Sequence, residues 1–256
     1  MPIFRTGRDL VYYAHVPKCG GSSIATYLLD RFGALAFHDD AFLLKPTEQR
    51  WTASSPQHVD AKTLERLIPL SFFDAIFTIV RHPVGRAVST YHFQLEVERS
   101  IPEGTGFTQW LDGIEAKRAA RPFLHDNHVR PMSELVPSGA TVFYMEHGLN
   151  ALIPWLDALT GTTAGPRAIV PENVRGAFVK TASARIKPSQ TDLAMIAEIY
   201  AEDFRRFGYV PANEMPDAPP PKTSPDFMAA RDRALAKATS PVGQLKRKLR
   251  RKIRRL

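Results

Sequence analysis

Apolar residues follow two kinds of pattern along this chain. Residues 75–80 (AIFTIV) form a nearly continuous apolar run, which is typical of a strand buried on both faces of a parallel sheet. Residues 11–14 and 141–145 are shorter runs rich in β-branched and aromatic side chains, and they also predict strands. Because stretches with helical spacing separate these runs, we expect an α/β fold with a parallel sheet.

Local signals mark where several helices begin and end. Pro83 suits a first helical position, because its missing N–H is not needed there. Ser189 followed by Asp192 is typical of a helix cap, and Gly161 and Gly208 suit helix ends. These signals and the apolar spacing predict helices over residues 24–32, 61–67, 84–98, 107–117, 149–159 and 189–206, and a further short strand over residues 35–38.

The composition changes after residue 210. The stretch VPANEMPDAPPPKTSP is rich in proline and has no hydrophobic period, which predicts an extended, semi-stiff linker. We therefore divide the chain into a domain over residues 1–210, a linker over 211–226 and a helical basic tail over 227–256.

The net charge of +8 is concentrated in one place. Residues 243–256 (GQLKRKLRRKIRRL) hold eight Lys or Arg and no acidic residue, and the remaining chain has 26 basic and 26 acidic residues. A formally neutral body argues against a broad nucleic-acid face, so we expect no nucleic-acid partner.

Membrane and secretion signals are not apparent in the sequence. No apolar run reaches the roughly 18 to 20 residues that cross a bilayer, and the first ten residues contain no stretch of signal-peptide length. The single cysteine, Cys19, forms no intramolecular disulfide and fits a reducing compartment. We therefore expect a cytoplasmic protein.

The stretch after the first strand has the features of an anion site. Residues 15–23 (HVPKCGGSS) join a strand to a helix through two glycines, which let the backbone approach a ligand closely. The N–H groups of a first helical turn attract phosphate, and Lys18 adds a positive charge. Cys19 is either a nucleophile or, as we favour, a small residue that fits a tight turn.

The order of residues in this loop separates three phosphate-binding motifs. A nucleotide P-loop requires G-x-x-x-x-G-K-[ST], but here the lysine precedes the glycines, and a G-x-G-x-x-G fingerprint is absent. The order P-K-x-G-G-S-S resembles the 5′-phosphosulfate loop of sulfotransferases that use 3′-phosphoadenosine 5′-phosphosulfate (PAPS). The resemblance assigns donor binding to Pro17, Lys18, Cys19, Gly20, Gly21, Ser22 and Ser23.

A second motif at the end of the 75–80 strand supports the same family. Residues 81–91 (RHPVGRAVSTY) resemble its 3′-phosphate motif, R-[DN]-P-x-x-R-x-x-S-x-[YF], which assigns phosphate binding to Arg81 and Ser89. An arginine at a strand end is well placed, because ligands gather there in open α/β sheets and guanidinium matches phosphate oxygens. His82 departs from the usual Asp or Asn, and Arg86 could either support the fold or touch the ligand.

Three later segments, 126–132, 143–149 and 199–209, resemble parts of carbohydrate sulfotransferases related to the chondroitin and heparan sulfate enzymes. The resemblance covers roughly residues 10–210. It implies a P-loop-like three-layer fold with a central parallel sheet flanked by helices. It also implies PAPS as donor, adenosine 3′,5′-bisphosphate (PAP) as product, no metal, and a carbohydrate or glycolipid hydroxyl as acceptor.

Sulfuryl transfer needs charge stabilisation and a base. Negative charge grows on the leaving phosphate, where Lys18 and the loop amides would stabilise it. A histidine suits the base near neutral pH, and we expect His38 or His128 to act as this base. Structural roles are expected for His82, His92 and His147.

The tail has its own pattern. Leu245, Leu249, Ile253 and Leu256 share one helical face and cations fill the rest, as in a helix that lies on an anionic membrane. We expect residues 243–256 to hold the protein peripherally at the inner face of the membrane. A disordered solubilising tail, a nucleic-acid arm and an acidic-glycan site are the alternatives.

Two other functions remain open on the residues alone. One is a P-loop kinase that uses ATP and magnesium, which the misplaced lysine disfavours. The other is a non-catalytic, membrane-tethered protein that binds a nucleotide or glycan.

Overall fold

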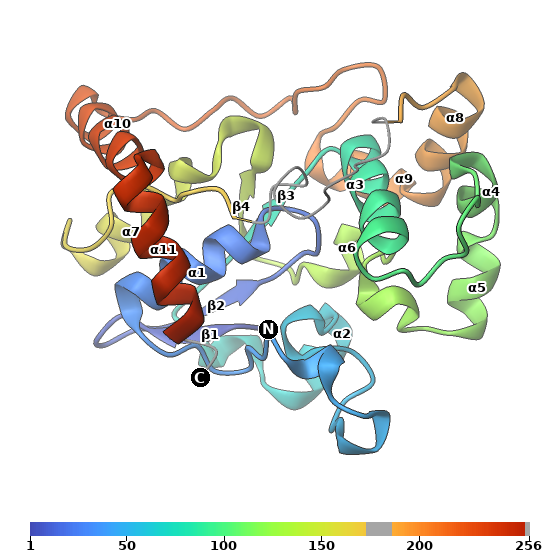
Figure 1. Cartoon of the computed structure of the whole chain (residues 1–256), viewed down its shortest axis with the longest axis horizontal. Coiled ribbons are helices and arrows are strands. Elements are labelled where there is room, and N and C mark those ends of the chain that lie inside the picture. The colour runs from blue at the N-terminus through green and yellow to red at the C-terminus, as the bar shows by residue number, and fades with distance from the viewer. Residues whose placement is uncertain (173–185, 254–256) are drawn as a thin grey trace.

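A computed structural model describes residues 1–172 and 186–253 of the chain (Figure 1). Four strands form one sheet in the order β1 (Ile3–Arg5), β2 (Leu10–Ala14), β3 (Ala75–Val80) and β4 (Thr141–Tyr144). The pairs β2–β3 and β3–β4 are parallel, whereas β1 pairs with β2 in antiparallel fashion. The expected α/β class with a central sheet flanked by helices is confirmed, and the sheet is mostly rather than wholly parallel because of β1.

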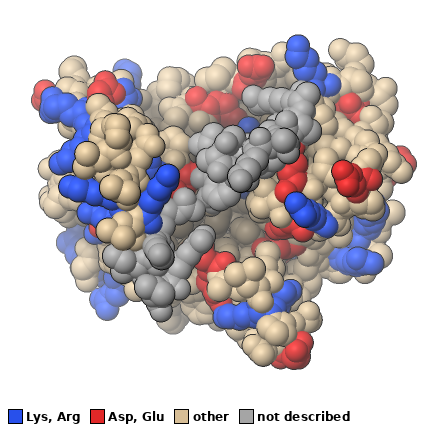
Figure 2. Space-filling model, in the orientation of Figure 1, with Lys and Arg blue, Asp and Glu red and all other residues tan. Residues whose placement is uncertain are grey.

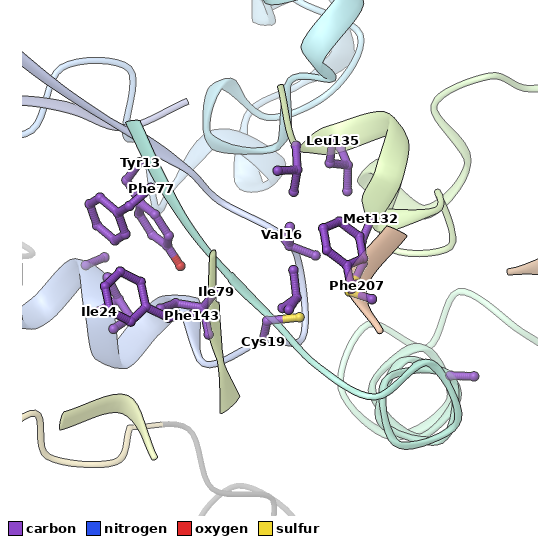
Figure 3. Close-up of a cluster of buried hydrophobic side chains, with 14 of the residues drawn as sticks. Tyr13, Val16, Cys19, Ile24, Phe77, Ile79, Met132, Leu135, Phe143 and Phe207 are labelled. Atoms are coloured by element: carbon purple, nitrogen blue, oxygen red, sulfur yellow. The ribbon is translucent and has the colours of Figure 1, made fainter. Parts of the chain in front are cut away.

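Side chains of β2 alternate between two apolar clusters, one on each face of the sheet. Val11 and Tyr13 belong to the larger cluster, whereas Tyr12 and Ala14 belong to the smaller one. Leu64 of α2 (Ala61–Leu67) packs in the smaller cluster. Helices α1 (Gly21–Phe32), α3 (Pro83–Glu96) and α7 (Leu152–Thr160) contribute to the larger cluster, part of which Figure 3 shows around Tyr13 and Phe77.

The remaining helices follow the chain in order, and all except the last contribute side chains to the larger cluster. They are α4 (Phe107–Asp112), α5 (Ile114–Ala120), α6 (Met132–Leu135), α8 (Gln190–Ile199), α9 (Ala201–Phe207), α10 (Pro225–Thr239) and α11 (Pro241–Ile253). In Figure 1, α3 to α6, α8 and α9 lie to the right of the strands, and α7, α10 and α11 lie to the left. The described part of the chain contains no helix long and apolar enough to span a membrane.

Most local signals are confirmed. The Ser189 hydroxyl accepts a hydrogen bond from the Asp192 N–H, and the Asp192 carboxylate accepts one from the Ser189 N–H, so the cap is a full capping box. Gly161 and Gly208 end α7 and α9 in left-handed conformations.

Four details differ from the sequence expectations. The strand expected over residues 35–38 is wrong, because only Ala36 pairs, in a single bridge with Ile3. The helix expected over 107–117 is divided at Gly113, and the one over 189–206 is divided at Tyr200. Strand β1 was not anticipated, although Gly7, with φ of 103°, supplies the turn that leads into β2.

The C-terminal part contacts the body. Phe227 at the start of α10 is buried in the larger apolar cluster, and the Arg167 guanidinium lies 5.3 Å from its ring centroid. The Ser224 hydroxyl caps α10 by accepting a hydrogen bond from the Phe227 N–H. The division into domain, linker and tail stays a prediction.

Candidate functional site

The loop of residues 15–23, here called the phosphate loop, joins β2 to α1. Gly20 is the N-cap of α1 with φ of 82°, and it has no side chain that could cap the first-turn N–H groups. A Cβ atom at Gly20 would lie 2.9 Å from Leu149 Cδ1, so the Leu149 side chain packs closely against the loop at this position. The glycine therefore serves both the left-handed turn and the close packing.

Gly21 is needed for a reason that the sequence does not show. A Cβ atom at this position would lie 1.6 Å from Nε2 of His15, which no real structure tolerates. The His15 ring stacks on Tyr13 of β2, with ring centroids 5.2 Å apart, and so lies directly beneath the helix start. The His15 side chain therefore packs directly against Gly21 of the phosphate loop.

Lys18 is the exceptional residue of the loop. It has a left-handed backbone with φ of 67°, which is uncommon outside glycine and marks strain of the kind that gathers at functional sites. Its Nζ atom lies 3.5 Å from the ring centroid of Phe93 on α3. Burial lowers the pKa of Lys18 to about 8, with Arg81 lowering it further and Glu98 opposing the shift. Burial also raises the pKa of Glu98 to about 7.

Arg81 connects the second motif to the first. Its Nη1 donates a hydrogen bond to the carbonyl oxygen of Lys18 at 3.3 Å, so the residues assigned to two phosphates belong to one site. The guanidinium passes over Gly85, where a Cβ atom would lie 3.3 Å from Arg81 Nε. Ser89 is one turn beyond Gly85 on the same face of α3 and is half-buried. Gly85, which sequence analysis missed, leaves room for the arginine.

Arg86 supports the fold. Its side chain is only 2% exposed and donates hydrogen bonds to three backbone carbonyls, those of Pro17 at 3.2 Å, His128 at 3.0 Å and Arg130 at 2.8 Å. One guanidinium therefore joins the phosphate loop to the segment around His128, which decides between the two roles considered for Arg86.

The segment over residues 199–209 is hydrogen-bonded to the chain that follows His128. The Tyr200 hydroxyl donates to the Val129 carbonyl at 3.1 Å. The Asp203 carboxylate accepts from the N–H groups of Met132 and Ser133 at 2.8 and 2.7 Å, which caps α6. Helix α9 thereby anchors the chain that follows His128.

His82 has a structural role at the start of α3. Its Nδ1 accepts a hydrogen bond from the Val84 N–H at 3.2 Å and so caps α3. The backbone N–H of His82 donates to Glu146 Oε1 at 2.8 Å, and Glu146 Oε2 accepts from the Tyr209 hydroxyl at 2.9 Å. These contacts fix the end of β3 beside the 143–149 and 199–209 segments.

A histidine paired with a carboxylate lies beside the phosphate loop. His58 Nδ1 is 2.7 Å from Asp126 Oδ2, which also accepts from the Ser55 hydroxyl at 2.7 Å. Asn127 Nδ2 donates to the His58 carbonyl at 2.8 Å. His125, Asp126 and Asn127 are all left-handed, and these residue types tolerate that conformation better than most.

The pairing with Asp126 orients the ring of His58. Burial raises the pKa of Asp126, but His58 and the hydrogen bonds from Ser55 outweigh it and leave the pKa lowered, so this carboxyl is ionised. An ionised carboxylate only accepts hydrogen bonds, so Nδ1 is the nitrogen of His58 that donates to Asp126, and Nε2 lies on the side of the ring away from this carboxylate. This arrangement is that of a histidine oriented to act as a base.

Ring contacts connect His58 to the phosphate loop from two directions. The ring centroids of His58 and His15 are 4.8 Å apart, and His15 lies beneath Gly21. On the other side, the centroids of His58 and His128 are 5.2 Å apart, as are those of His128 and Phe93, which contacts Lys18. We call His15, His58 and His128 the histidine cluster.

The two histidines expected as bases occupy different places. His128 belongs to the histidine cluster, and burial, with His58 and Lys18 nearby, lowers its pKa well below the ordinary value. Its Nδ1 is 3.1 Å from Gln94 Nε2, so an amide proton occupies that lone pair. His38 makes none of these ring contacts, although it lies near enough to lower the pKa of His15, and its Nε2 is 3.2 Å from the exposed Asp40 carboxylate. Sequence analysis missed His58, which no local motif marks.

Cys19 is buried in the larger apolar cluster, as Figure 3 shows. Burial raises the pKa of its thiol to about 12, although Arg86 and Arg81 act in the opposite sense. A protonated, inaccessible thiol is a poor nucleophile, which supports the packing role. Among the described residues, no group of three or more His, Cys, Asp and Glu side chains is arranged to hold a metal ion.

Comparison with known proteins identifies the family. A model described as "Sulfotransferase family" matches residues 1–210, which include the phosphate loop, Arg81 and the histidine cluster. Neither curated proteins nor solved structures gave a significant match. Because the family model covers most of the chain, this protein belongs to the sulfotransferase family.

Proposed function

We propose that this protein transfers a sulfuryl group from PAPS to a hydroxyl of a carbohydrate or glycolipid acceptor. The observation that carries the proposal is the hydrogen bond from Arg81 to the Lys18 carbonyl. It joins a loop suited to one phosphate with an arginine and serine suited to a second, and PAPS has phosphates at both ends of its ribose. The family supports sulfuryl transfer in general.

The donor side rests on the phosphate loop. The uncapped start of α1, together with Lys18, would bind the 5′-phosphosulfate, and Arg81 with Ser89 would bind the 3′-phosphate. During transfer the leaving phosphate keeps the electron pair of the breaking S–O bond, and Lys18 of the phosphate loop would stabilise that charge. No residue of this set requires a metal.

The acceptor side rests on His58. We assign the base to Nε2 of His58, which takes the acceptor proton as the new S–O bond forms, while Asp126 stabilises the resulting imidazolium. We place His58 in this role instead of His38 or His128. Its Nδ1 lies 2.7 Å from the buried Asp126 carboxylate, whereas Nδ1 of His128 is 3.8 Å from the Glu98 carboxylate. The pairing of His38 is with the exposed Asp40, and Nδ1 of His128 is taken by Gln94.

A surface hollow provides a candidate acceptor entrance. It is lined by Ser100 and residues 121–125, and the Ser100 hydroxyl donates to Gln94 Oε1. Gln94 in turn contacts His128, so the hollow adjoins the histidine cluster through two polar contacts. Amide, hydroxyl and guanidinium groups suit sugar hydroxyls.

The proposal is tested by ligand binding and by transfer. Titration calorimetry is expected to show binding of PAP and no binding of ATP with magnesium, because the loop lacks the P-loop order of residues. A screen of glycans and glycolipids with PAPS is expected to give one acceptor with a PAPS-dependent gain of one sulfuryl group in mass. Preference for ATP would indicate a kinase, and PAP binding without transfer to any acceptor would indicate a binding protein.

The affinity for PAP is expected to fall as the pH rises through about 8, the pKa of Lys18 before ligand binds. Only the protonated amine attracts phosphate, so affinity is complete below this pH and declines above it by up to about tenfold per pH unit. Calorimetry over this pH range measures the effect. Lys18→Arg is the matched control, because arginine stays charged and its profile should be flat. A flat wild-type profile would contradict the assignment.

A further inference from the structure

Helix α11 exposes an apolar stripe to solvent. Its large aliphatic residues Val242, Leu245 and Leu249 are 63%, 69% and 59% exposed. They are spaced by three and four positions, so they lie on one side of the helix, which we call the α11 stripe. Scattered exposed leucines are ordinary, but an aligned set is a binding feature.

The helix is attached by its opposite side. Arg247 Nη2 pairs with Glu172 Oε1 at 2.6 Å and donates to the Pro171 carbonyl at 3.1 Å. At 100° per residue, Arg247 lies roughly 160° around the helix from Leu249. An amphipathic surface helix ordinarily buries its apolar side against the core. In α11 a cation faces the body and the leucines face away from it.

Positive charge borders the stripe on both sides. Lys246 and Arg250 lie on one flank and Lys248 on the other, and all three are exposed. Figure 2 shows blue side chains gathered around the tan surface of α10 and α11 at the left of this face. Since the rest of the chain is formally neutral, this helix dominates the charge that an approaching surface would meet.

We propose that the α11 stripe is a docking surface for a lipid bilayer that carries anionic headgroups. The leucines would enter the headgroup boundary while the flanking cations contact lipid phosphates and carboxylates. A second copy of this chain does not fit, because two such cationic helices repel each other. Nucleic acid does not fit either, because its backbone would pair with the cations and leave the aligned leucines exposed.

The attachment also ties docking to the phosphate loop. The Glu172 N–H donates to the Ser23 hydroxyl at 2.8 Å, and Ser23 is in the first turn of α1. The chain segment that holds Arg247 is therefore bonded to the donor site itself. If the proposed function holds, sulfuryl transfer takes place beside the bilayer surface, and a glycolipid headgroup is the acceptor class that this position favours.

The test is sedimentation of the full-length protein with vesicles. We expect binding to vesicles of phosphatidylcholine and phosphatidylserine, release by added salt, and no binding to phosphatidylcholine alone. The double variant Leu245→Ser/Leu249→Ser should bind the anionic vesicles about tenfold or more weakly. Leu67→Ser/Phe72→Ser is the matched control, because those side chains are similarly exposed elsewhere on the surface, and its binding should be unchanged.

Each contrary result is decisive. Equal binding to both vesicle types, or equal binding by wild type and the leucine variant, would overturn the proposal. Tighter binding to duplex DNA than to anionic vesicles, unaffected by the leucine changes, would make α11 a nucleic-acid arm instead. PAP calorimetry on the same variants separates the two hypotheses. If a leucine variant keeps its PAP affinity but no longer binds vesicles, the docking proposal is supported. If the wild type does not bind PAP, the proposed function is contradicted and the docking proposal is not affected.

Discussion

Replacement of His58 by asparagine is expected to lower the turnover number of sulfuryl transfer by about 10²- to 10⁴-fold, the usual contribution of a positioned base. Asparagine keeps an N–H donor for Asp126 near the position of Nδ1 but lacks the rest of the ring, including the Nε2 atom that would take the proton. PAP affinity should be unchanged, since none of the contacts that hold Lys18 or Arg81 involves His58. Single-turnover transfer and calorimetry measure the two effects separately.

Three further variants make this expectation specific. Asp126→Asn should also lower turnover, because the ring of His58 loses the carboxylate that orients it. His38→Ala and His128→Ala test the bases expected from the sequence, and both should retain more activity than His58→Asn. If that variant turns over normally while His38→Ala or His128→Ala is inactive, the base is the residue whose loss abolishes transfer.

Replacement of Arg86 by methionine is expected to lower the free energy of unfolding by about 3–5 kcal/mol. Methionine has similar length but no donors, so the carbonyls of Pro17, His128 and Arg130 would lose a charged hydrogen-bond partner in a buried place. Arg86→Lys should rescue little, because one ammonium cannot reproduce the fork of donors that contacts three carbonyls. Urea unfolding followed by circular dichroism measures the change.

A matched arginine provides the control for this prediction. Arg205 pairs with Glu202 on the exposed side of α9, where water screens the ion pair, so Arg205→Met should leave the unfolding midpoint where it is. Equal midpoints for wild type and Arg86→Met would show that the phosphate loop and the His128 segment are held by other contacts. A separate loss of PAP affinity in a still-folded Arg86→Met would show that the guanidinium also orders the phosphate loop.

Elements with strong local signals could be predicted from the sequence. Strand β3 has the limits that its apolar run suggests, and the capping box of Ser189 and Asp192 starts α8 where expected. Such signals work because strand burial and helix capping depend on residues within a few positions of one another. The phosphate loop belongs to the same class, since its strand, glycines and helix start are contiguous.

Elements that depend on residues far away in the sequence could not be predicted from the sequence. Strand β1 is three residues long and exists because β2 and Ala36 offer hydrogen bonds, which no local pattern announces. The divided helices at Gly113 and Tyr200 have apolar spacing on both sides of the break, so periodicity alone joins them. Tyr200 leaves helical geometry while its hydroxyl reaches the Val129 carbonyl.

The sequence alone indicated the proposed donor side, because Lys18, the glycines and Arg81 each follow a strand whose end is a natural ligand position. The proposed acceptor side depends on the tertiary structure. His58 meets Asp126 across 68 residues, and Gly21 meets His15 through the bend of the phosphate loop. The same holds for α11, whose amphipathic pattern is local but whose outward direction is set by the pairing of Arg247 with Glu172. Local chemistry specifies which groups are available, and packing specifies which of them face one another.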